Sequence, residues 1–361
     1  DARGVRRLKT FARKKEADLF EANATVEIRD GVHIADSDSV SVSEAAELWI
    51  TSGESAGLER STLDQYRRHL KYHIEPFVGG ALLSKLTVPA VRAFQDTLRE
   101  NGRSSAMVRK VLGSLGSILF DAQERGLTVR NPVKDMRGTR RKGKERQAEK
   151  RKKGKLRVGV DIPARTEVQA LISVLEGHWR ALMMTAVFTG MRSSELRGLR
   201  WPDVDFRASE IHVRQRADQF GEIGPPKSEA GERTIPVPPL VINTLREWRV
   251  RTNHDLVFAN PDGHPRSHTN IINKGLVPAM LKAGVVADGN AKYTGLHSLR
   301  HFFASWCINR KEDGGLGLPP NVVQERLGHA SIVMTMDVYG HLFPRGDDSK
   351  ELEEAATALL G

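Results

Sequence analysis

Cysteine is nearly absent from this chain of 361 residues, which contains only Cys307. An intramolecular disulfide is therefore excluded, and a reducing compartment is the natural expectation. Long hydrophobic runs are also absent, because the longest one, residues 181–191, is interrupted by Thr and Gly and is too short to span a bilayer. The first residues show no signal-peptide pattern. We expect a soluble, intracellular protein, and the start at Asp1 instead of Met is typical of a trimmed chain with an upstream piece missing.

Metal-binding patterns are missing as well. Seven of the twelve histidines follow residue 250, but their spacing matches no tight ligand motif and no Cys pair accompanies them. We therefore expect no metal site and no other cofactor.

Positive charge is abundant and unevenly placed. The net charge is +11 and the pI is near 9.8. Residues 134–158 alone carry thirteen Lys and Arg against three Asp and Glu. A basic block in a folded protein of this size favours nucleic acid as the polyanion it contacts. The alternative is a disordered spacer that contacts nothing.

The apolar spacing predicts a mainly α protein with a small antiparallel sheet, an α+β fold. Residues 41–133 contain four or five segments with apolar residues three and four apart, bounded by Ser caps, Pro and Gly, which predicts a small helical bundle. The basic segment 134–160 has no such periodicity and is a linker. Helical spacing returns at 161–346, where EIHVRQ and RTIPV flank a Gly/Pro-rich stretch and predict a hairpin. Residues 347–361 form an acidic amphipathic helix.

The C-terminal half contains five separated pieces that fit one reaction. They are TGMRSSEL with Arg192 and Glu195, the hairpin lysine Lys227, HSLRH with His297 and Arg300, LGH with His329, and DVYGH with Tyr339. Taken singly, each piece is more often a surface or core residue than a catalytic one; Arg192, for example, would pair with Glu195 in solvent. On a helix, His297, Arg300 and His301 share a face and form an electropositive patch suited to an anion.

Four tyrosines compete for the role of a nucleophile. Tyr66 and Tyr72 lie in the apolar rhythm of the helical bundle and are interpreted as packing residues. Tyr293 lies shortly before His297 and is a decoy, whereas Tyr339 lies between two Gly-His motifs.

In this order and spacing, the pieces resemble the catalytic set of the tyrosine recombinase (phage integrase) family. The resemblance extends over residues 163–345 through TGMRSSEL, HSLRHFFAS, LGHASI and YGHLF. STLDQYRRHLKYHIEPFVG is similar to the family's helical core-binding domain, and KTFARKKEADLF within residues 1–39 to the end of its arm-type DNA-binding domain. One departure is the interval from His329 to Tyr339, which is ten residues here and nine in many members.

The resemblance implies an integrase of a phage or integrative mobile element, which cleaves and rejoins DNA through a 3′-phosphotyrosyl intermediate. Cleavage builds charge on the phosphate oxygens, and fixed cations offset that charge without a metal. The implied catalytic residues are Arg192, Lys227, His297, Arg300, His329 and Tyr339, with Glu195 as an accessory residue.

Each implied residue has a distinct role. Arg192 and Arg300 would bind the phosphate, Tyr339 would attack it, and Lys227 would protonate the leaving 5′-oxygen. The two histidines would assist proton transfer, and Glu195 would orient the helix start at Arg192. Because the covalent link conserves the bond energy, we expect no ATP requirement, and the chain contains no Gly-x-x-x-x-Gly-Lys loop.

The expected partners are double-stranded DNA with specific attachment sites and three further copies of the chain in a tetramer. Accessory DNA-bending or directionality proteins belong to the same expectation, and a membrane does not. The expected location is the cytoplasm of a bacterial host, at the nucleoid. The side chains expected to contact DNA are Lys9, Arg13, Lys14, Arg67, Arg68, Arg140, Arg141, Lys142, Arg151, Lys152 and Lys153.

Two other functions remain open at this point. One is a related tyrosine strand-transferase acting as a resolvase or a type IB-like topoisomerase, although an arm-like N-terminus favours the integrase. The other is a non-catalytic DNA-binding regulator on a recombinase scaffold, against which the complete residue set argues.

Overall fold

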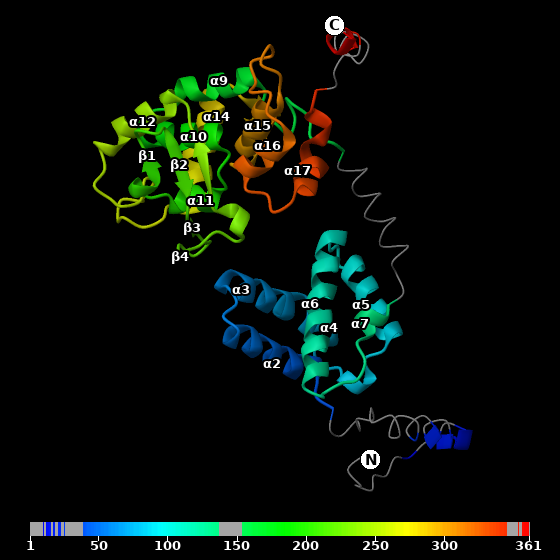
Figure 1. Cartoon of the computed structure of the whole chain (residues 1–361). Coiled ribbons are helices and arrows are strands. Elements are labelled where there is room, and N and C mark those ends of the chain that lie inside the picture. Colours follow the sequence, from blue (N-terminus) through cyan, green and yellow to red (C-terminus); the bar gives the residue numbers. More distant parts are fainter. Residues whose placement is uncertain are drawn as a thin grey trace. The chain divides into compact units, whose positions relative to one another are not determined.

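The structure is a computed structural model that describes residues 39–136 and 154–344, and isolated residues from 10 to 25 and from 353 to 360. Contacts divide the chain into two compact units at residues 149 and 150. We call them the N-terminal and C-terminal units and describe each by itself (Figure 1). Most of the arm-like stretch, the middle of the basic linker and most of the C-terminal segment lie outside the described residues.

Helices make up the described part of the N-terminal unit. They are α2 (Val42–Ser55), α3 (Arg60–His69), η1 (Leu70–Ile74), α4 (Glu75–Val78), η2 (Leu83–Lys85), α5 (Val88–Glu100), α6 (Ser105–Glu124) and α7 (Pro132–Asp135). The three long helices α2, α5 and α6 occur where the apolar spacing predicts them.

Capping side chains decide where these helices begin. The Ser41 hydroxyl accepts the Glu44 N–H, and the Glu44 carboxylate accepts the Ser41 N–H at 2.7 Å, a reciprocal cap that starts α2. Thr87 and Ser104 accept backbone N–H groups in the same way at the starts of α5 and α6. Leu115 lies in the core that α6 fills, and burying such a side chain contributes about 1.5–3 kcal/mol.

The two tyrosines of this unit differ in burial. Tyr66 packs against Trp49 with ring centroids 4.3 Å apart and the rings tilted by 31°, as expected of a packing residue. The packing interpretation of Tyr72 is wrong, because its side chain is 54% exposed. Six residues after Tyr66, Tyr72 lies off the buried stripe, and His73 occupies the inward position seven residues on.

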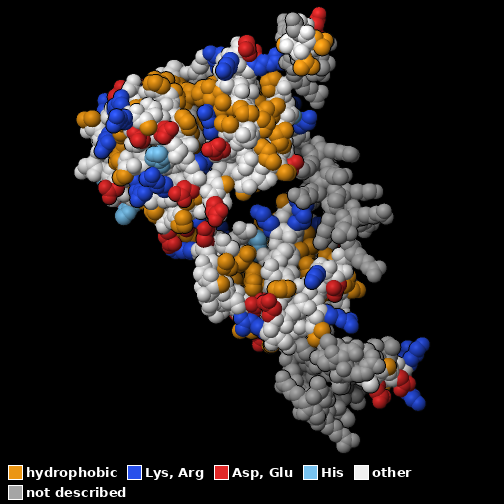
Figure 2. All heavy atoms as spheres, in the orientation of Figure 1, with side chains coloured by type: hydrophobic (Ala, Val, Ile, Leu, Met, Phe, Trp, Pro, Cys, Tyr) orange, Lys and Arg blue, Asp and Glu red, His pale blue; other side chains and the backbone are white. Residues whose placement is uncertain are grey.

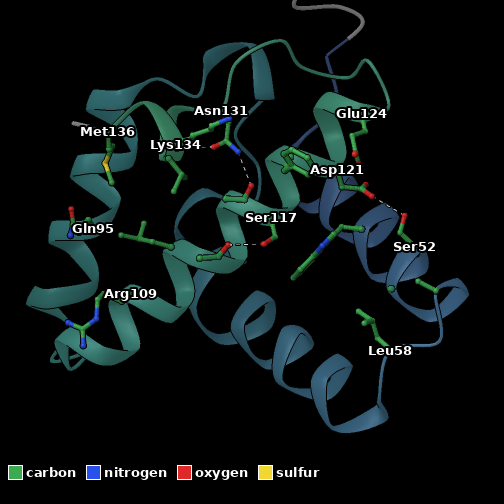
Figure 3. Close-up of a pocket in the computed structure, with 18 residues that line it drawn as sticks. Ser52, Leu58, Gln95, Arg109, Ser117, Asp121, Glu124, Asn131, Lys134 and Met136 are labelled. Atoms are coloured by element: carbon green, nitrogen blue, oxygen red, sulfur yellow. Dashed lines mark hydrogen bonds between the residues drawn. The ribbon is translucent and has the colours of Figure 1, made fainter. Parts of the chain in front are cut away.

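A groove of about 850 Å³ runs beside α6 in this unit (Figure 3). Trp49, Leu58, Leu112 and Phe120 line it, and Met136 borders it. Polar groups at its edge bind one another, as when the Ser52 hydroxyl donates to Asp121 at 2.9 Å. None of the residues predicted to be catalytic lines this groove.

The C-terminal unit is helical around small antiparallel sheets. Its first half contains α9 (Arg165–Val174), α10 (Gly177–Thr189), α11 (Ser193–Gly198), η3 (Trp201–Asp203), β1 (Val204–Asp205), β2 (Glu210–Val213), β3 (Arg216–Ala217), β4 (Ile223–Gly224), η4 (Glu229–Gly231), β5 (Arg233–Pro236) and α12 (Pro239–Arg249). Its second half contains α13 (His268–Asn270), η5 (Ile271–Leu276), α14 (Val277–Lys282), β6 (Val286–Ala287), β7 (Asn290–Ala291), α15 (His297–Ile308), α16 (Pro320–Leu327), α17 (Ile332–Tyr339) and η6 (Gly340–Leu342).

The predicted hairpin is confirmed as the pairing of β2 with β5. Ile211 lies opposite Ile235, and β1 pairs with the other edge of β2. Between the two long strands the chain forms a second short hairpin, β3 with β4. The confirmed fold class is thus mainly α with small antiparallel sheets.

Helix α10 contains the longest apolar run of the sequence, and it is a core helix. Residues 181–187 are all buried. The helix ends at Gly190, whose φ of +59° is left-handed, and a Cβ there would lie 2.4 Å from the Phe303 ring. Among the described residues, no helix is long and apolar enough to cross a membrane.

Helix α17 has an exposed apolar outer face. Ile332, Val333, Met334 and Met336 are between 39% and 63% exposed. Figure 2 shows hydrophobic side chains in the area where Figure 1 draws α17. Its inner face buries Thr335 and Tyr339.

Candidate active site

Arg192 occupies the position before the first turn of α11. Gly190 ends α10 in a left-handed conformation. Two residues further on, Arg192 is the N-cap residue of α11. The Glu195 carboxylate accepts the Arg192 backbone N–H at 2.7 Å and its guanidinium at 2.8 Å. The Arg192 side chain is 37% exposed, so it is accessible from solvent.

Glu195 also binds a second arginine, Arg233, which leads β5. The Arg233 guanidinium donates to both carboxylate oxygens, at 2.9 and 3.2 Å, and both side chains are 3% exposed. Burial alone raises the pKa of Glu195, but Arg233 and Arg192 outweigh it and hold that pKa below its usual range. Glu195 is therefore a buried anion between two cations.

Three arginines converge on the C-terminal end of α16. Carbonyl groups in the last turn of a helix lack intrahelical partners and carry partial negative charge, which suits cations. The three bonds join Arg233 Nε to the Arg326 carbonyl (2.8 Å), Arg300 Nη2 to the Leu327 carbonyl (2.5 Å) and Arg192 Nη2 to the Gly328 carbonyl (2.9 Å). Successive carbonyls of one helix end thus hold the two predicted catalytic arginines and Arg233.

The cluster carries an excess of positive charge. Three arginines face the single carboxylate of Glu195, and Arg300 gives its other nitrogen to the Gly190 carbonyl at 2.6 Å. Burial, followed by the charge of Arg192, lowers the pKa of Arg300 to about 10, so it stays charged at neutral pH. This arrangement can bind and stabilise an anion that displaces the carbonyl contacts.

The first turn of α15 brings a histidine pair to Tyr339. His301 Nδ1 lies 2.7 Å from the Tyr339 hydroxyl, and the His297 ring packs edge-on against His301 with centroids 4.5 Å apart. Burial raises the pKa of Tyr339 to about 12, although the charge of Arg300 opposes this. Partial burial, followed by Arg300 and Arg192, lowers the pKa of the more exposed His297.

His329 lies on the other side of the tyrosine ring. The two rings are parallel within 5°, with centroids 6.4 Å apart. His329 Nδ1 pairs with the Thr335 hydroxyl at 2.9 Å, which fixes the orientation of the ring. Burial, followed by Arg300, lowers the pKa of His329 to about 4.

Tyr293 has a different environment. Its hydroxyl donates to the Glu167 carboxylate at 2.9 Å. Burial and this carboxylate raise its pKa, because the phenolate would face a negative charge. Tyr293 supports the start of α9 and is not coupled to the arginines.

Lys227 is exposed and lies on the loop between β4 and η4. Of the side chains expected to contact DNA, Arg13, Lys14, Arg67 and Arg68 are described and exposed. Arg67 pairs with Glu54, and Arg68 pairs with Asp64 at 3.1 Å. The others, Lys9, Arg140, Arg141, Lys142, Arg151, Lys152 and Lys153, lie outside the described residues.

Two residues of the cluster were not among the predicted set. The sequence could have indicated that Arg233 is buried. Side chains two positions apart in a strand lie on the same face, so Arg233 must face inward if Ile235 does. The sequence could also have indicated His301. Residues four apart in a helix lie on the same face, and His301 follows His297 by four positions. What the spacing could not show is the partner of each side chain.

Comparisons with known proteins show what this chain is similar to. The model of the phage integrase family matches residues 164–345. A tyrosine recombinase XerC-like protein of Caldanaerobacter subterraneus subsp. tengcongensis is 24% identical, with 92% of this chain and 87% of the relative covered. The ICEBs1 integrase of Bacillus subtilis is 26% identical over 84% of this chain and 81% of its own.

Among solved structures, the Tn1549 transposon integrase in complex with transposon right end DNA is similar in fold. The TM-score is 0.65 at 19% identity, and 88% of this chain and 100% of that chain are covered. The fold and the clustered residues define an enzyme that cleaves and rejoins DNA in site-specific recombination. The chain belongs to the phage integrase family, the tyrosine recombinases.

Proposed function

We propose that Tyr339 is the nucleophile of this recombinase and that Arg192 and Arg300 bind the phosphate it attacks. The Tyr339 oxygen forms a bond to phosphorus, the bond to the 5′-oxygen breaks, and a 3′-phosphotyrosyl link and a free 5′-hydroxyl result. One diester replaces another, so no ATP is needed. The observation that carries the proposal is the convergence of both arginines on the end of α16, in the same cluster as Tyr339.

The remaining roles follow from position and chemistry. Lys227, on its exposed loop, donates a proton to the leaving 5′-oxygen. His297 and His329 hydrogen-bond the phosphate or assist proton transfer. Glu195 positions Arg192 through two hydrogen bonds. The arginines act by fixed positive charge, which stabilises the charge that develops on the phosphate.

We assign the parts of the chain as follows. Residues 41–133 are a core-binding domain, 161–346 the catalytic domain and 1–39 the end of an arm-type domain. The basic linker 134–160 runs along the duplex and adds salt-dependent affinity. Residues 347–361 contact a neighbouring subunit.

A surface on α17 supports that last assignment. Val333 and Met334 are 63% and 48% exposed, and Leu359 and Leu360 of the C-terminal segment are 84% and 86% exposed. We propose that the chain acts as a tetramer on DNA in the bacterial cytoplasm, integrating or excising a mobile element, with accessory proteins. Loss of the tetramer on DNA upon removal of residues 347–361 is the expected result in analytical ultracentrifugation.

A covalent capture experiment tests the proposed nucleophile. Nicked duplexes with a randomised central region are incubated with the protein, and adducts that survive denaturant are isolated and sequenced. We expect adducts with the wild type, none with Tyr339→Phe, and retained adducts with the matched control Tyr293→Phe. An adduct with Tyr339→Phe would show that another residue attacks.

The same experiment separates the other functions. No adduct from the wild type would leave a DNA-binding regulator. Adducts that give relaxed circles without joints between two duplexes would indicate a topoisomerase. Joints between two duplexes carrying the captured sequence support the integrase.

A further inference from the structure

The Tyr339 hydroxyl has one hydrogen-bond partner within the described part of the chain. It is Nδ1 of His301, at 2.7 Å, with the two rings edge-on and centroids 5.7 Å apart. The tyrosine side chain is 2% exposed, which leaves little room for a water molecule at its hydroxyl. The phenolic proton must leave before or during the attack, and His301 is the group in contact with it.

Among the described residues, the other groups around the tyrosine make contacts that do not include a hydrogen bond to its hydroxyl. His329 lies parallel to the tyrosine ring and gives Nδ1 to Thr335. The His297 ring packs edge-on against the His301 ring, with centroids 4.5 Å apart. Arg300 uses both terminal nitrogens on backbone carbonyls and is a cation, which cannot accept a proton.

His301 is a neutral imidazole in this site. Burial, followed by His297 and Arg300, lowers its pKa to about 4, although Asp161 opposes this. A neutral ring with its hydrogen on Nε2 accepts a hydrogen bond from the phenol at Nδ1. Proton acceptance at neutral pH therefore requires a change in the surroundings.

Binding of a DNA phosphate would supply that change. The phosphate would pair with the arginines whose positive charge disfavours imidazolium, and its own negative charge favours imidazolium. The same pairing would leave a proton on His301 close to the developing charge of the pentavalent phosphorus. The step is then coupled to the presence of substrate.

We propose that His301 is the general base of DNA cleavage and takes the phenolic proton of Tyr339 at Nδ1. The Tyr339 oxygen bonds to phosphorus as the bond to the 5′-oxygen breaks, and the 5′-oxygen takes its proton from Lys227. In the reverse step His301 returns the proton to the phenol. The inference rests on the proposed function of Tyr339.

The first test compares substitutions at His301 in the full chain, with the captured duplex as the substrate. His301→Gln retains a hydrogen-bond acceptor but cannot take the proton at neutral pH. General-base catalysis contributes about 10²–10⁴-fold, so we expect the single-turnover rate of adduct formation to fall by about 100-fold or more. Duplex affinity stays unchanged, and His264→Gln on an exposed turn is the matched control.

The second test changes the leaving group. A duplex with sulfur in place of the bridging 5′-oxygen needs no proton on departure, because a thiolate leaves readily. We expect this substrate to restore cleavage by Lys227→Ala and not by His301→Gln. Rescue of His301→Gln would show that His301 acts on the leaving group and would overturn the proposal.

The outcomes distinguish the inference from the proposed function. No adduct from the wild type defeats both. Adducts from the wild type and equal rates from His301→Gln defeat only the role of His301. If His301→Gln lowers the thermal unfolding midpoint too far for assay, His301→Asn is tested in the same way, and wild-type rates from it would likewise overturn the proposal.

Discussion

Arg233 is a buried charge whose partners lie on two different elements. It binds both oxygens of Glu195 and the last turn of α16, and its side chain is 3% exposed. Removing one member of a buried ion pair leaves the other charge without a partner, which costs more than the pair contributes. Here the remaining charge would be the buried Glu195, which would lose the partner of both its oxygens and keep only Arg192, whose side chain is 37% exposed.

We predict that Arg233→Ala lowers the free energy of unfolding by about 3–5 kcal/mol, measured by urea denaturation. The matched control is Arg214→Ala, since Arg214 is 51% exposed and its partner Asp203 keeps Arg200 at 2.9 Å. The control should cost about 1 kcal/mol or less. Equal losses from the two substitutions would contradict a special role for the buried pair.

At the scale of elements, the end of α16 depends on Gly328. Its φ of +63° is left-handed, which glycine adopts without strain. A Cβ would lie 2.8 Å from the Ala230 carbonyl oxygen and 2.9 Å from Arg233 Nη1. The glycine of the Leu-Gly-His motif thus lets η4 and the Arg233 side chain approach the helix end.

We predict that Gly328→Ala destabilises the chain by more than Gly317→Ala and slows adduct formation. Gly317 also has a left-handed φ, +58°, but its nearest neighbour is a side-chain carbon of Lys311 at 3.8 Å. Gly317→Ala therefore measures the conformational cost alone, roughly 1–2 kcal/mol. Similar unfolding midpoints in urea for both variants would show that the close approach at Gly328 is unimportant.

The element that carries Tyr339 could be located from the sequence, but its contacts could not. The ten-residue interval from His329 is accommodated by α17, and Tyr339 still reaches His301 and lies parallel to His329. Helical periodicity indicates on which face of a helix a side chain lies, but not which other side chain it contacts. The contact with His301 depends on how α15 and α17 pack.

At the scale of the whole molecule, both units contain histidines that burial keeps neutral. Burial lowers the pKa of His69, which shares a hydrogen bond with Ser114, in the N-terminal unit. Burial, with nearby cations, lowers the pKa values of His301 and His329 to about 4 in the C-terminal unit. In the unfolded chain a histidine has a pKa of about 6.5.

We therefore predict that acid destabilises the protein well before its carboxylates titrate. Between pH about 4 and about 6.5 the unfolded chain binds more protons than the folded one, so the free energy of unfolding falls as pH falls. The thermal midpoint, followed by tryptophan fluorescence, should drop from pH 7 to pH 5. A His329→Gln variant should show a smaller drop, and a midpoint that stays constant or rises on acidification would contradict the prediction.

The sequence alone determined the fold class and indicated the family. Apolar spacing, caps and the strand period are local properties, so they locate α2, α5, α6 and the hairpin of β2 and β5. The order of Arg, Lys, His-x-x-Arg, Leu-Gly-His and Tyr is also a property of the sequence itself. It was enough to indicate the family that the comparisons show.

Only the tertiary structure decided which side chains meet. Glu195 and Arg233 are 38 residues apart, and Arg192 and Gly328 are 136 apart, yet each pair is in contact. It also separated Tyr339, beside histidines and Arg300, from Tyr293, beside Glu167. The physical reason is that spacing along the chain specifies a face of an element, whereas a partner is specified only when the faces of different elements pack together.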